Sequence, residues 1–429
     1  QCVGLLCVVS FFFVIPGKGQ KADKWLALVC ISSPVFIALA SSAKPMLLPA
    51  AMTTSALLLV HFQLSKISKK SPAVEVRNAF VLVCLLVMAS ANMKMNFMLS
   101  GGVIGCLAVL FLVNSKFRLT AISVGTLMFC ATILPFVFWK SYYFGGGLLD
   151  ALLQPFPGDW PGTTSFEKML RNYRDTSIYF PISLLIPSGL NKITTVLGIG
   201  LIFLLSCSRW YEFQCRELVI AILLVSIGYI VFGQLNSRFF IEPLYWVFIA
   251  YHLESAKKSP SRFLETKTVK ILISIQVCLV LISLTFGISQ LLPGALSPSL
   301  RKNVMHRFAD GYDVMSWANE VLPPDVTIIS KHRSVGLAAR PVISNDWEDH
   351  IRLEVQGGLV YSSIVARKFP EFMIVLSNAP PDQMHCFSEI YAGPYSAEIR
   401  RRNPFNSIDS YNAWILKKDL FCSNKGMIK

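Results

Sequence analysis

Long blocks of apolar residues, nearly free of charge, fill the first two thirds of the chain and limit what it can fold into. A transmembrane helix needs about 20 consecutive apolar residues, within a range of about 17–25. Blocks that approach this length lie at residues 4–16, 25–43, 46–64, 80–91, 97–113, 119–139, 193–207, 218–232, 239–253 and 271–291. Charged residues make up only 15% of the chain, whereas soluble domains carry about 25%. The sequence therefore predicts an α-helical polytopic membrane protein with about ten transmembrane helices.

The blocks place a transmembrane domain in residues 1–292, which one long polar loop at residues 140–178 interrupts. Within this loop, residues 155–162 are rich in Pro and Gly, which is typical of a shaped loop rather than a helix. Residues 179–190 contain two prolines and a glycine. That run predicts a broken or re-entrant helix, because the freed backbone groups need partners at membrane depth.

Residues 293–429 lack such blocks and read as a small α/β domain. Residues 312–322 place apolar side chains at helical spacing, and two prolines then end the predicted helix. Strands are expected at residues 326–330, 372–376 and 411–416, in a partly parallel sheet. Cys386 and Cys422 are the two cysteines of this domain, and they can pair if it faces an oxidising compartment.

The distribution of Lys and Arg predicts an orientation. The loops at residues 17–24, 65–78, 115–118, 208–217 and 255–270 are rich in basic residues. The positive-inside rule places them in the cytoplasm, so the long loop and the C-terminal domain lie on the opposite, outer side. The net charge of +15 is then mainly a topology signal and a contact with anionic membrane lipids. No nucleic-acid motif accompanies it, so we do not expect nucleic acid as a partner.

Three cations break this trend: Lys44, Lys94 and Arg238 fall at outer helix junctions. An anionic ligand held there would explain the exception, and a lipid phosphate or diphosphate suits Lys and Arg because charge-assisted hydrogen bonds hold its oxygens. Two structural alternatives stay open. Each cation can snorkel to the interface, and Arg238 can pair with Glu242 one helical turn later.

Four features together carry a family resemblance. A Lys-Pro pair, Lys44-Pro45, lies between two blocks, and a second lysine occurs in Asn92-Met-Lys94-Met-Asn96. A late block begins Asn236-Ser-Arg238-Phe-Phe-Ile-Glu-Pro243, and the C-terminal domain opens with a helix, a Pro pair and a strand at residues 317–329. In this order the chain resembles membrane glycosyltransferases of the GT-C class, similar to protein mannosyltransferases and aminoarabinose transferases. The likeness covers most of the chain and lies in the order of its parts rather than in any one specific motif.

This resemblance implies transfer of a sugar from a polyprenyl-phosphate-linked donor to a glycan, lipid or protein acceptor at the outer face. Lys44, Lys94 and Arg238 would then stabilise the charge on the leaving phosphate. The resemblance also implies the bacterial inner (plasma) membrane, with the C-terminal domain in the periplasm. It implies no redox cofactor. A divalent metal is compatible with the class, although no convincing set of metal ligands is evident in the sequence.

The catalytic acid of this class usually lies in the first outer loop. Here the first outer connection is Lys44-Pro45, with no acid beside it. We therefore expect an N-terminally truncated sequence whose catalytic loop precedes residue 1. Asp159, in the turn Pro157-Gly-Asp-Trp-Pro161, is the candidate within the chain for accepting the acceptor's proton. Its alternative role is to cap that turn.

Three other function classes remain open. A transporter or flippase of a lipid-linked or anionic substrate would need charges deeper in the spans or paired broken helices. A polysaccharide polymerase or ligase would use arginines of the outer loop, and Arg171 and Arg174 are available for this. A non-catalytic membrane protein would bind a partner through its soluble C-terminal domain.

Overall fold

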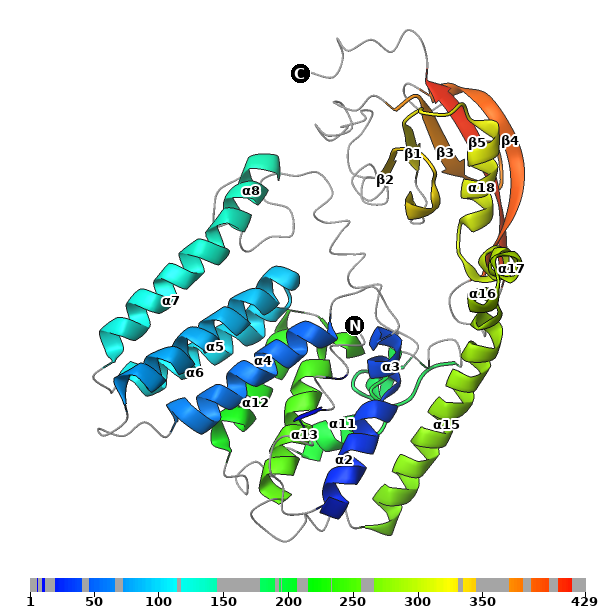
Figure 1. Ribbon diagram of the computed structural model, residues 1–429. Helices are drawn as coiled ribbons and strands as arrows, with labels where there is room; N and C mark the ends of the chain where they lie inside the picture. The colour runs from blue at the N-terminus through cyan, green and yellow to red at the C-terminus, as the bar shows by residue number, and fades with distance from the viewer. Residues whose placement is uncertain are drawn as a thin grey trace. The chain divides into compact units, whose positions relative to one another are not determined.

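The computed structural model (Figure 1) describes the following residues: 6, 10–11, 20–40, 46–65, 72–113, 117–144, 178–189, 193, 195–206, 215–232, 234–255, 266–330, 335–344, 370–380, 387–400 and 408–418. These residues form two compact units, an N-terminal helical unit up to Ser283 and a C-terminal unit from Leu284 onward. Seven residues singled out above lie outside the described residues: Lys44, Pro45, Asp159, Arg171, Arg174, Cys386 and Cys422.

Helices make up the N-terminal unit. They are α2 (Gln20–Ser32), α3 (Pro34–Ala40), α4 (Leu47–Leu59), α5 (Ala73–Met93), α6 (Phe97–Val113), α7 (Arg118–Thr132), α8 (Leu134–Phe144), α11 (Gly200–Ser206), α12 (Arg216–Val231), α13 (Ile241–Ser255) and most of α15 (Lys267–Leu291), whose last two turns belong to the C-terminal unit. A π-helical turn, Val60–Leu64, continues α4. Single 3-10 turns occur at Ile182–Leu184 and Ser237–Phe239. The predicted helical class of this region is therefore confirmed.

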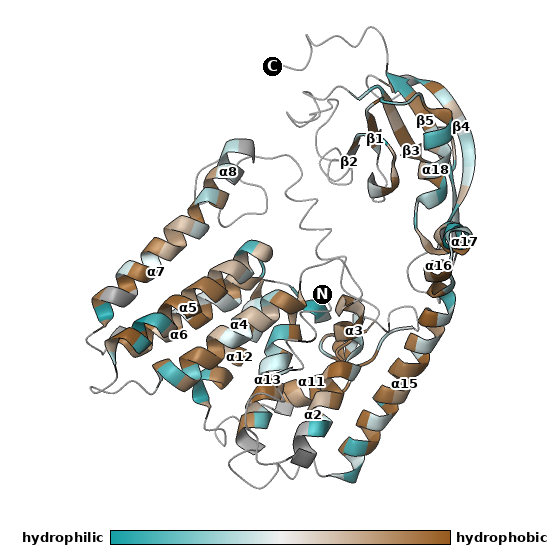
Figure 2. Ribbon diagram, in the orientation of Figure 1, coloured by the Kyte–Doolittle hydropathy of each residue, from teal (hydrophilic) through white to brown (hydrophobic). Residues whose placement is uncertain are grey.

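Among the described residues, four helical stretches are long and apolar enough to cross a membrane: Leu47–Leu64, Ala73–Met93, Ile122–Trp139 and Lys267–Leu291. Figure 2 shows how hydrophobic residues dominate them, α15 above all. A shorter apolar helix spans Phe97–Leu112. Other predicted blocks form shorter helices, such as α12 with 16 residues and α13 with 15. The count of about ten spans therefore stays a prediction.

Helix α13 forms the centre of the N-terminal unit. Its residues Leu244, Tyr245, Trp246, Val247 and Phe248 are all completely buried. A helix that is apolar on every side must be surrounded by other elements, and α2, α4, α11 and α12 all contact it. Figure 1 shows these helices gathered around α13. This packing positions the first turn of α13 beside α4 and α12.

Helix α15 packs through one narrow face. Its buried residues are Val269, Ile273, Gln276 and Val280, which recur at the three- and four-residue spacing of a single helical stripe. The opposite side carries exposed apolar side chains, for example Leu281 and Ile282. Soluble proteins rarely expose large apolar surfaces, and such a surface marks a contact with a membrane or with another protein. On a helix of this length, the hydrocarbon of a bilayer is the natural cover.

The apolar block at residues 25–43 is divided in the structure. The helical conformation is interrupted at Ser33, between α2 and α3. The Ser33 hydroxyl donates to the Leu197 carbonyl at 3.2 Å. Gln276 of α15 completes the junction, because its amide donates to the Ser32 hydroxyl at 3.0 Å and accepts from the Ile199 N–H at 2.8 Å. Non-helical backbone in an apolar interior needs such partners, and these side chains supply them.

The C-terminal unit contains a five-stranded sheet in the order β2-β1-β3-β5-β4. Its strands are β1 (Ile328–Ser330), β2 (Val342–Ser344), β3 (Phe372–Leu376), β4 (Phe387–Arg400) and β5 (Ile408–Lys418). Strand β1 pairs in parallel with β2 and β3, whereas β5 is antiparallel to β3 and β4. The sheet is therefore partly parallel, as predicted.

Helices α16 (Pro293–Leu296) and α17 (Pro298–Phe308) lead to α18 (Tyr312–Val321), which packs on the sheet. Val314, Met315 and Ala318 of α18 are buried in the core of this unit. Trp317 stacks on Tyr395 of β4, with ring centroids 5.0 Å apart. The predicted helix at residues 312–322 is thus present within one residue.

Some strand predictions need correction. The first predicted strand begins at Ile328 rather than at residue 326, and the last extends on both sides of residues 411–416. Strands β2 and β4 were not predicted. The middle of β4 carries Gly393-Pro394, a pair that signals a turn. The strand accommodates the pair because its pairing with β5 shifts register around it.

Candidate functional site

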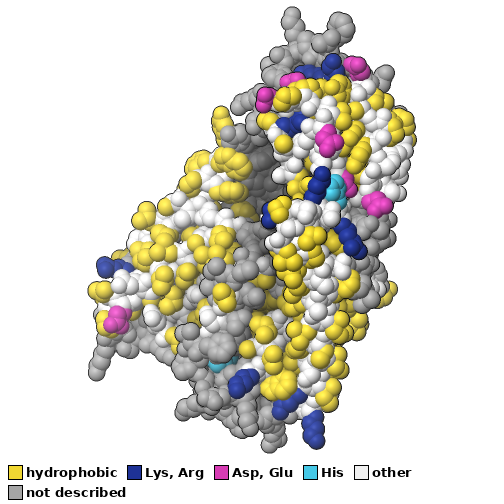
Figure 3. Space-filling view, turned by 45° about the vertical axis from the view of Figure 1, so that its right-hand side comes forward, with side chains coloured by type: hydrophobic (Ala, Val, Ile, Leu, Met, Phe, Trp, Pro, Cys, Tyr) yellow, Lys and Arg dark blue, Asp and Glu magenta, His cyan; other side chains and the backbone are white. Residues whose placement is uncertain are grey.

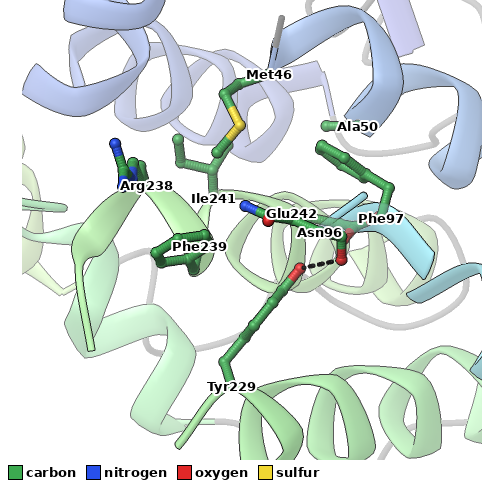
Figure 4. Close-up of a pocket in the computed structure, with 9 residues that line it drawn as sticks. All are labelled: Met46, Ala50, Asn96, Phe97, Tyr229, Arg238, Phe239, Ile241 and Glu242. Atoms are coloured by element: carbon green, nitrogen blue, oxygen red, sulfur yellow. Dashed lines mark hydrogen bonds between the residues drawn. The ribbon is translucent and has the colours of Figure 1, made fainter. Parts of the chain in front are cut away.

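A small pocket lies where five segments of the N-terminal unit meet (Figure 4). Its lining residues are Met46, Ala50, Asn96, Phe97, Tyr229, Arg238, Phe239, Ile241 and Glu242. They come from the start of α4, the turn before α6, the end of α12, the 3-10 turn and the start of α13. In this conformation the pocket has room for about one water molecule, so a larger ligand requires side chains to move.

Arg238 is held at the rim of the pocket by local backbone structure. It lies in the 3-10 turn Ser237–Phe239, which begins where the Asn236 side-chain oxygen accepts a hydrogen bond from the Arg238 N–H at 3.2 Å. The guanidinium carbon lies 5.0 Å from the centroid of the Phe239 ring. Contact with a ring face is favourable for Arg, and here it keeps the charge at the pocket.

Glu242 contributes a carboxyl that is only 2% exposed. The Thr53 hydroxyl of α4 is hydrogen-bonded to its Oε1 atom, whereas the nearby Ser100 hydroxyl of α6 donates to the Phe97 carbonyl at 3.1 Å. Its Oε2 atom is buried and has no hydrogen-bond partner among the described residues. Glu242 also lies in the first turn of α13, where the helix dipole favours negative charge. A buried polar atom without a partner is uncommon and often has a functional cause.

Threonines fix α4 against α13 next to this carboxyl. The Thr53 hydroxyl also lies 3.2 Å from the Pro49 carbonyl and 3.1 Å from the Ala50 carbonyl. Because a hydroxyl has one proton, it donates to only one of these oxygens at a time. One residue further on, the Trp246 indole N–H donates to the Thr54 hydroxyl at 3.0 Å. These contacts hold Glu242 in register with α4.

Tyr229 and Asn96 form the opposite wall. The Tyr229 hydroxyl donates to the Asn96 backbone carbonyl at 3.4 Å, as the dashed line in Figure 4 shows. This contact joins the end of α12 to the turn between α5 and α6. The pocket is therefore enclosed by tertiary contacts on two sides rather than by one loop.

Lys94 lies directly behind one wall of the pocket. It ends α5, and its Nζ atom is 2.9 Å from the Met46 sulfur, which belongs to a lining residue. Thioether sulfur is only a weak hydrogen-bond acceptor, and the Met side chain is flexible. Lys94 therefore neighbours the pocket through Met46 and is not itself one of its lining residues.

Of the three predicted cations, Arg238 lines the pocket and Lys94 contacts its lining residue Met46, although 144 positions separate the two cations in the sequence. The predicted alternative of an Arg238–Glu242 ion pair is wrong. Helix α13 begins at Ile241, so the two residues do not occupy successive turns of one helix and their side chains do not pair. Among the described residues, no group of three or more His, Cys, Asp or Glu side chains is placed to hold a metal ion.

From the sequence, Glu242 was one of several outer acids and an optional partner for Arg238, and it was not chosen as a site residue. The signal that could have found it is an acid inside the apolar block at residues 239–253, because an ionisable residue at membrane depth is a functional candidate by itself. Its burial and its threonine contact could not be read from the sequence.

A second polar contact lies farther along α4. His61 Nδ1 is 3.1 Å from Glu217 Oε2 at the start of α12. His61 belongs to the π-helical turn, a distortion that is frequent at functional sites. Eleven residues separate it from Ala50, which corresponds to about 16 Å along a helix. The pair is therefore distinct from the pocket.

Two family models together match almost the entire chain. The DUF1420 N-terminal domain matches residues 1–305, and the DUF1420 C-terminal domain matches residues 306–425. No curated protein and no solved structure matches the chain. The division between the two family models falls within α17, beyond the last apolar helix.

Proposed function

We propose that this chain, which belongs to the DUF1420 family, is a membrane glycosyltransferase that acts on a polyprenyl-phosphate-linked sugar. In this proposal the pocket beside Arg238 and Glu242 binds the phosphate and the reacting sugar at the outer face of the membrane. One observation carries the proposal. A guanidinium and a buried carboxyl with an unpartnered oxygen line the same pocket.

Phosphate binding would depend on Arg238. Its guanidinium can hold two phosphate oxygens at once, and Lys94 would add a second cation after Met46 moves aside. Both cations would interact more strongly with the phosphate as the bond from the anomeric carbon to the phosphate oxygen breaks, because negative charge then grows on the leaving group. The apolar surface of the long helices would accommodate the polyprenyl chain.

Glu242 would serve as the proton acceptor. In the reaction, the acceptor oxygen forms a bond to the anomeric carbon while the bond from that carbon to the phosphate oxygen breaks. The electron pair of the broken bond leaves with the lipid phosphate, and the acceptor's proton moves to Glu242 Oε2. This atom suits the role because no described residue already donates a hydrogen bond to it, and the Thr53 contact orients the carboxyl.

The test is sugar transfer by the full-length protein in membranes, with a panel of radiolabelled polyprenyl-phosphate sugars. Two variants separate the roles. Glu242→Gln keeps an oxygen for Thr53 but cannot accept the proton, so transfer should fall by roughly 100-fold or more while donor binding persists. Arg238→Gln should weaken donor binding itself.

Two exposed residues of α5 provide matched controls, since Glu75→Gln and Arg77→Gln remove the same charges away from the pocket. Both control variants should transfer sugar at the rate of the wild type. Transfer that survives Glu242→Gln unchanged would remove Glu242 from the mechanism. Absence of both binding and transfer with every donor in the wild type would overturn the proposed function.

A proton-coupled transporter of an anionic or lipid-linked substrate is the second candidate. The observation that favours it is that two carboxyls contact one continuous helical stretch, Leu47–Leu64, Glu242 near its start through Thr53 and Glu217 near its end through His61. Substrate-dependent proton flux into proteoliposomes, without covalent change of the substrate, would support transport over transfer.

A further inference from the structure

A short basic helix, α17 (Pro298–Phe308), follows the long apolar helix α15 after a tight connection. None of its residues is buried. It carries Arg301, Lys302 and Arg307, and no acidic residue occurs between positions 267 and 309. Figure 3 shows Lys and Arg side chains beside the hydrophobic surface of this region. We infer that α17 lies in the headgroup layer of the membrane and binds the phosphates of anionic lipids.

The apolar side of α17 supports this position. Leu300, Val304 and Phe308 recur every four residues and therefore share one side of the helix. In the preceding turns, Leu292 is 52% exposed and Leu296 is 71% exposed. Exposed leucines next to cations are typical of helices that lie in the plane of the membrane interface. The acyl chains would cover the leucines while the basic side chains reach the headgroups.

The direction of α17 is fixed by its own contacts. The Arg301 Nε–H donates to the Gly294 carbonyl at 3.3 Å, and the Ser297 hydroxyl accepts from the Leu300 N–H at 3.2 Å. A Cβ atom at Gly294 would lie only 3.1 Å from Val304 Cβ, so the two short helices pack closely. Ser297 has an extended backbone, with φ −152° and ψ 157°, so the chain turns between α16 and α17.

The length of α15 sets the depth of this turn. Its 25 residues correspond to about 37 Å of helix, which exceeds the roughly 30 Å of bilayer hydrocarbon. If α15 spans the bilayer, its C-terminal end reaches the headgroup layer, and α17 begins close to that end. The inference is independent of the proposed sugar transfer, because it involves no residue of the pocket.

The test is hydrogen–deuterium exchange of the full-length protein in nanodiscs. One set contains phosphatidylcholine alone, and the other contains phosphatidylcholine and phosphatidylglycerol in equal parts. Amides of residues 298–308 should exchange more slowly in the anionic discs, whereas α18 should exchange equally in both. High salt should reduce the difference, because it screens exposed charges.

Lys302→Gln together with Arg307→Gln should remove most of the lipid effect and retain the Arg301 contact with Gly294. Each basic residue near an anionic surface strengthens binding by roughly fivefold, so exchange in anionic discs should accelerate by roughly 30-fold. Lys267→Gln with Lys270→Gln removes the same charge at the other end of α15 and should leave α17 unchanged. The exchange of α18 reports whether each variant is folded.

Equal exchange of α17 in the two kinds of disc would overturn the inference. The same conclusion would follow from a lipid effect that persists after Lys302 and Arg307 are both replaced. The charge-conserving exchange of these residues, Lys302→Arg with Arg307→Lys, should retain the effect, and its loss would also contradict binding through charge.

Discussion

The Thr53 hydroxyl contacts the Glu242 carboxyl across the interface of α4 and α13, 189 positions apart in the sequence. This contact joins the buried acid of the pocket to a helix that is long and apolar enough to cross a membrane. It also positions the unpartnered Oε2 atom of Glu242. The stability of the pocket and the orientation of its carboxyl should therefore depend on Thr53.

Thr53→Val keeps the shape of the side chain but removes the hydroxyl. We expect it to lower the free energy of unfolding by about 1–3 kcal/mol, because Oε1 of Glu242 then loses a partner in a buried setting. Thermal unfolding in nanodiscs measures this change. Ser55→Ala is the control, since Ser55 lies on the same helix and its hydroxyl contacts only the Ala51 carbonyl, at 2.9 Å. An equal effect of both variants would contradict a specific role for the Thr53 contact.

Gly198→Ala should destabilise the N-terminal unit by about 1–3 kcal/mol. Gly198 has a φ of +61°, and a Cβ atom there would overlap the Gln276 side-chain oxygen, so both strain and a lost hydrogen bond contribute. Gly102→Ala is the matched control in α6, where a Cβ atom meets nothing within 4 Å. That variant should be neutral or slightly stabilising because Ala favours helix. Equal unfolding temperatures for the two variants would refute the prediction.

The His61–Glu217 contact should appear as an energetic coupling. Groups in direct contact typically show coupling of about 0.5–3 kcal/mol in a double-mutant cycle. We expect His61→Gln and Glu217→Gln to cost less together than the sum of their separate costs, as measured by unfolding in nanodiscs. Glu75→Gln and Arg77→Gln, two positions apart on the exposed side of α5, do not face each other and should be additive. Additivity of the first pair would show that the contact contributes nothing.

The sheet unit should lose stability at high pH. Burial raises the pKa of Tyr411 above its ordinary value of 10.0, and the nearby Asp310 and Asp313 add to the shift. The pKa of Tyr395 is raised for the same reasons, with burial first and then Asp313 and Glu320. Because these folded-state values exceed the unfolded ones, the stabilisation is complete below about pH 10 and is lost as pH rises toward the folded-state pKa.

Tyr411→Phe tests this dependence. Between about pH 9 and pH 11, an ordinary Tyr changes from the neutral phenol to the phenolate. Over this range the unfolding temperature of the variant should decline less than that of the wild type. The same comparison at neutral pH separates the loss of the hydroxyl's contacts from its titration. Identical slopes in the two proteins would show that Tyr411 titrates normally.

Apolar patterning was sufficient to predict much of the architecture. The long apolar blocks indicated a helical membrane chain, and the periodicity of residues 312–322 located α18 within one residue. Strand β3 was predicted at its observed limits, since Phe372–Leu376 is a continuous apolar run of strand length. These elements could be predicted because their signals are local. Strand β4 was missed because its Gly-Pro pair is a local turn signal that pairing with β5 overrides.

The candidate site could be predicted only in part. Lys94 and Arg238 were found because each is a cation at a position where the charge pattern of the loops disfavours one. Glu242 was not predicted as a site residue and entered only as an alternative partner for Arg238, because its environment depends on where α13 begins and on which helix lies beside it.

By itself, the sequence determined the chemical character of the chain. Long uncharged apolar runs cannot be covered by water, so they require a lipid or a protein interior, whatever the detailed packing. Only the tertiary structure decided which polar groups meet. Lys94 contacts Met46, which lines the pocket of Arg238, and Thr53 contacts Glu242. Such meetings depend on packing between helices far apart along the chain, which no local pattern of residues encodes.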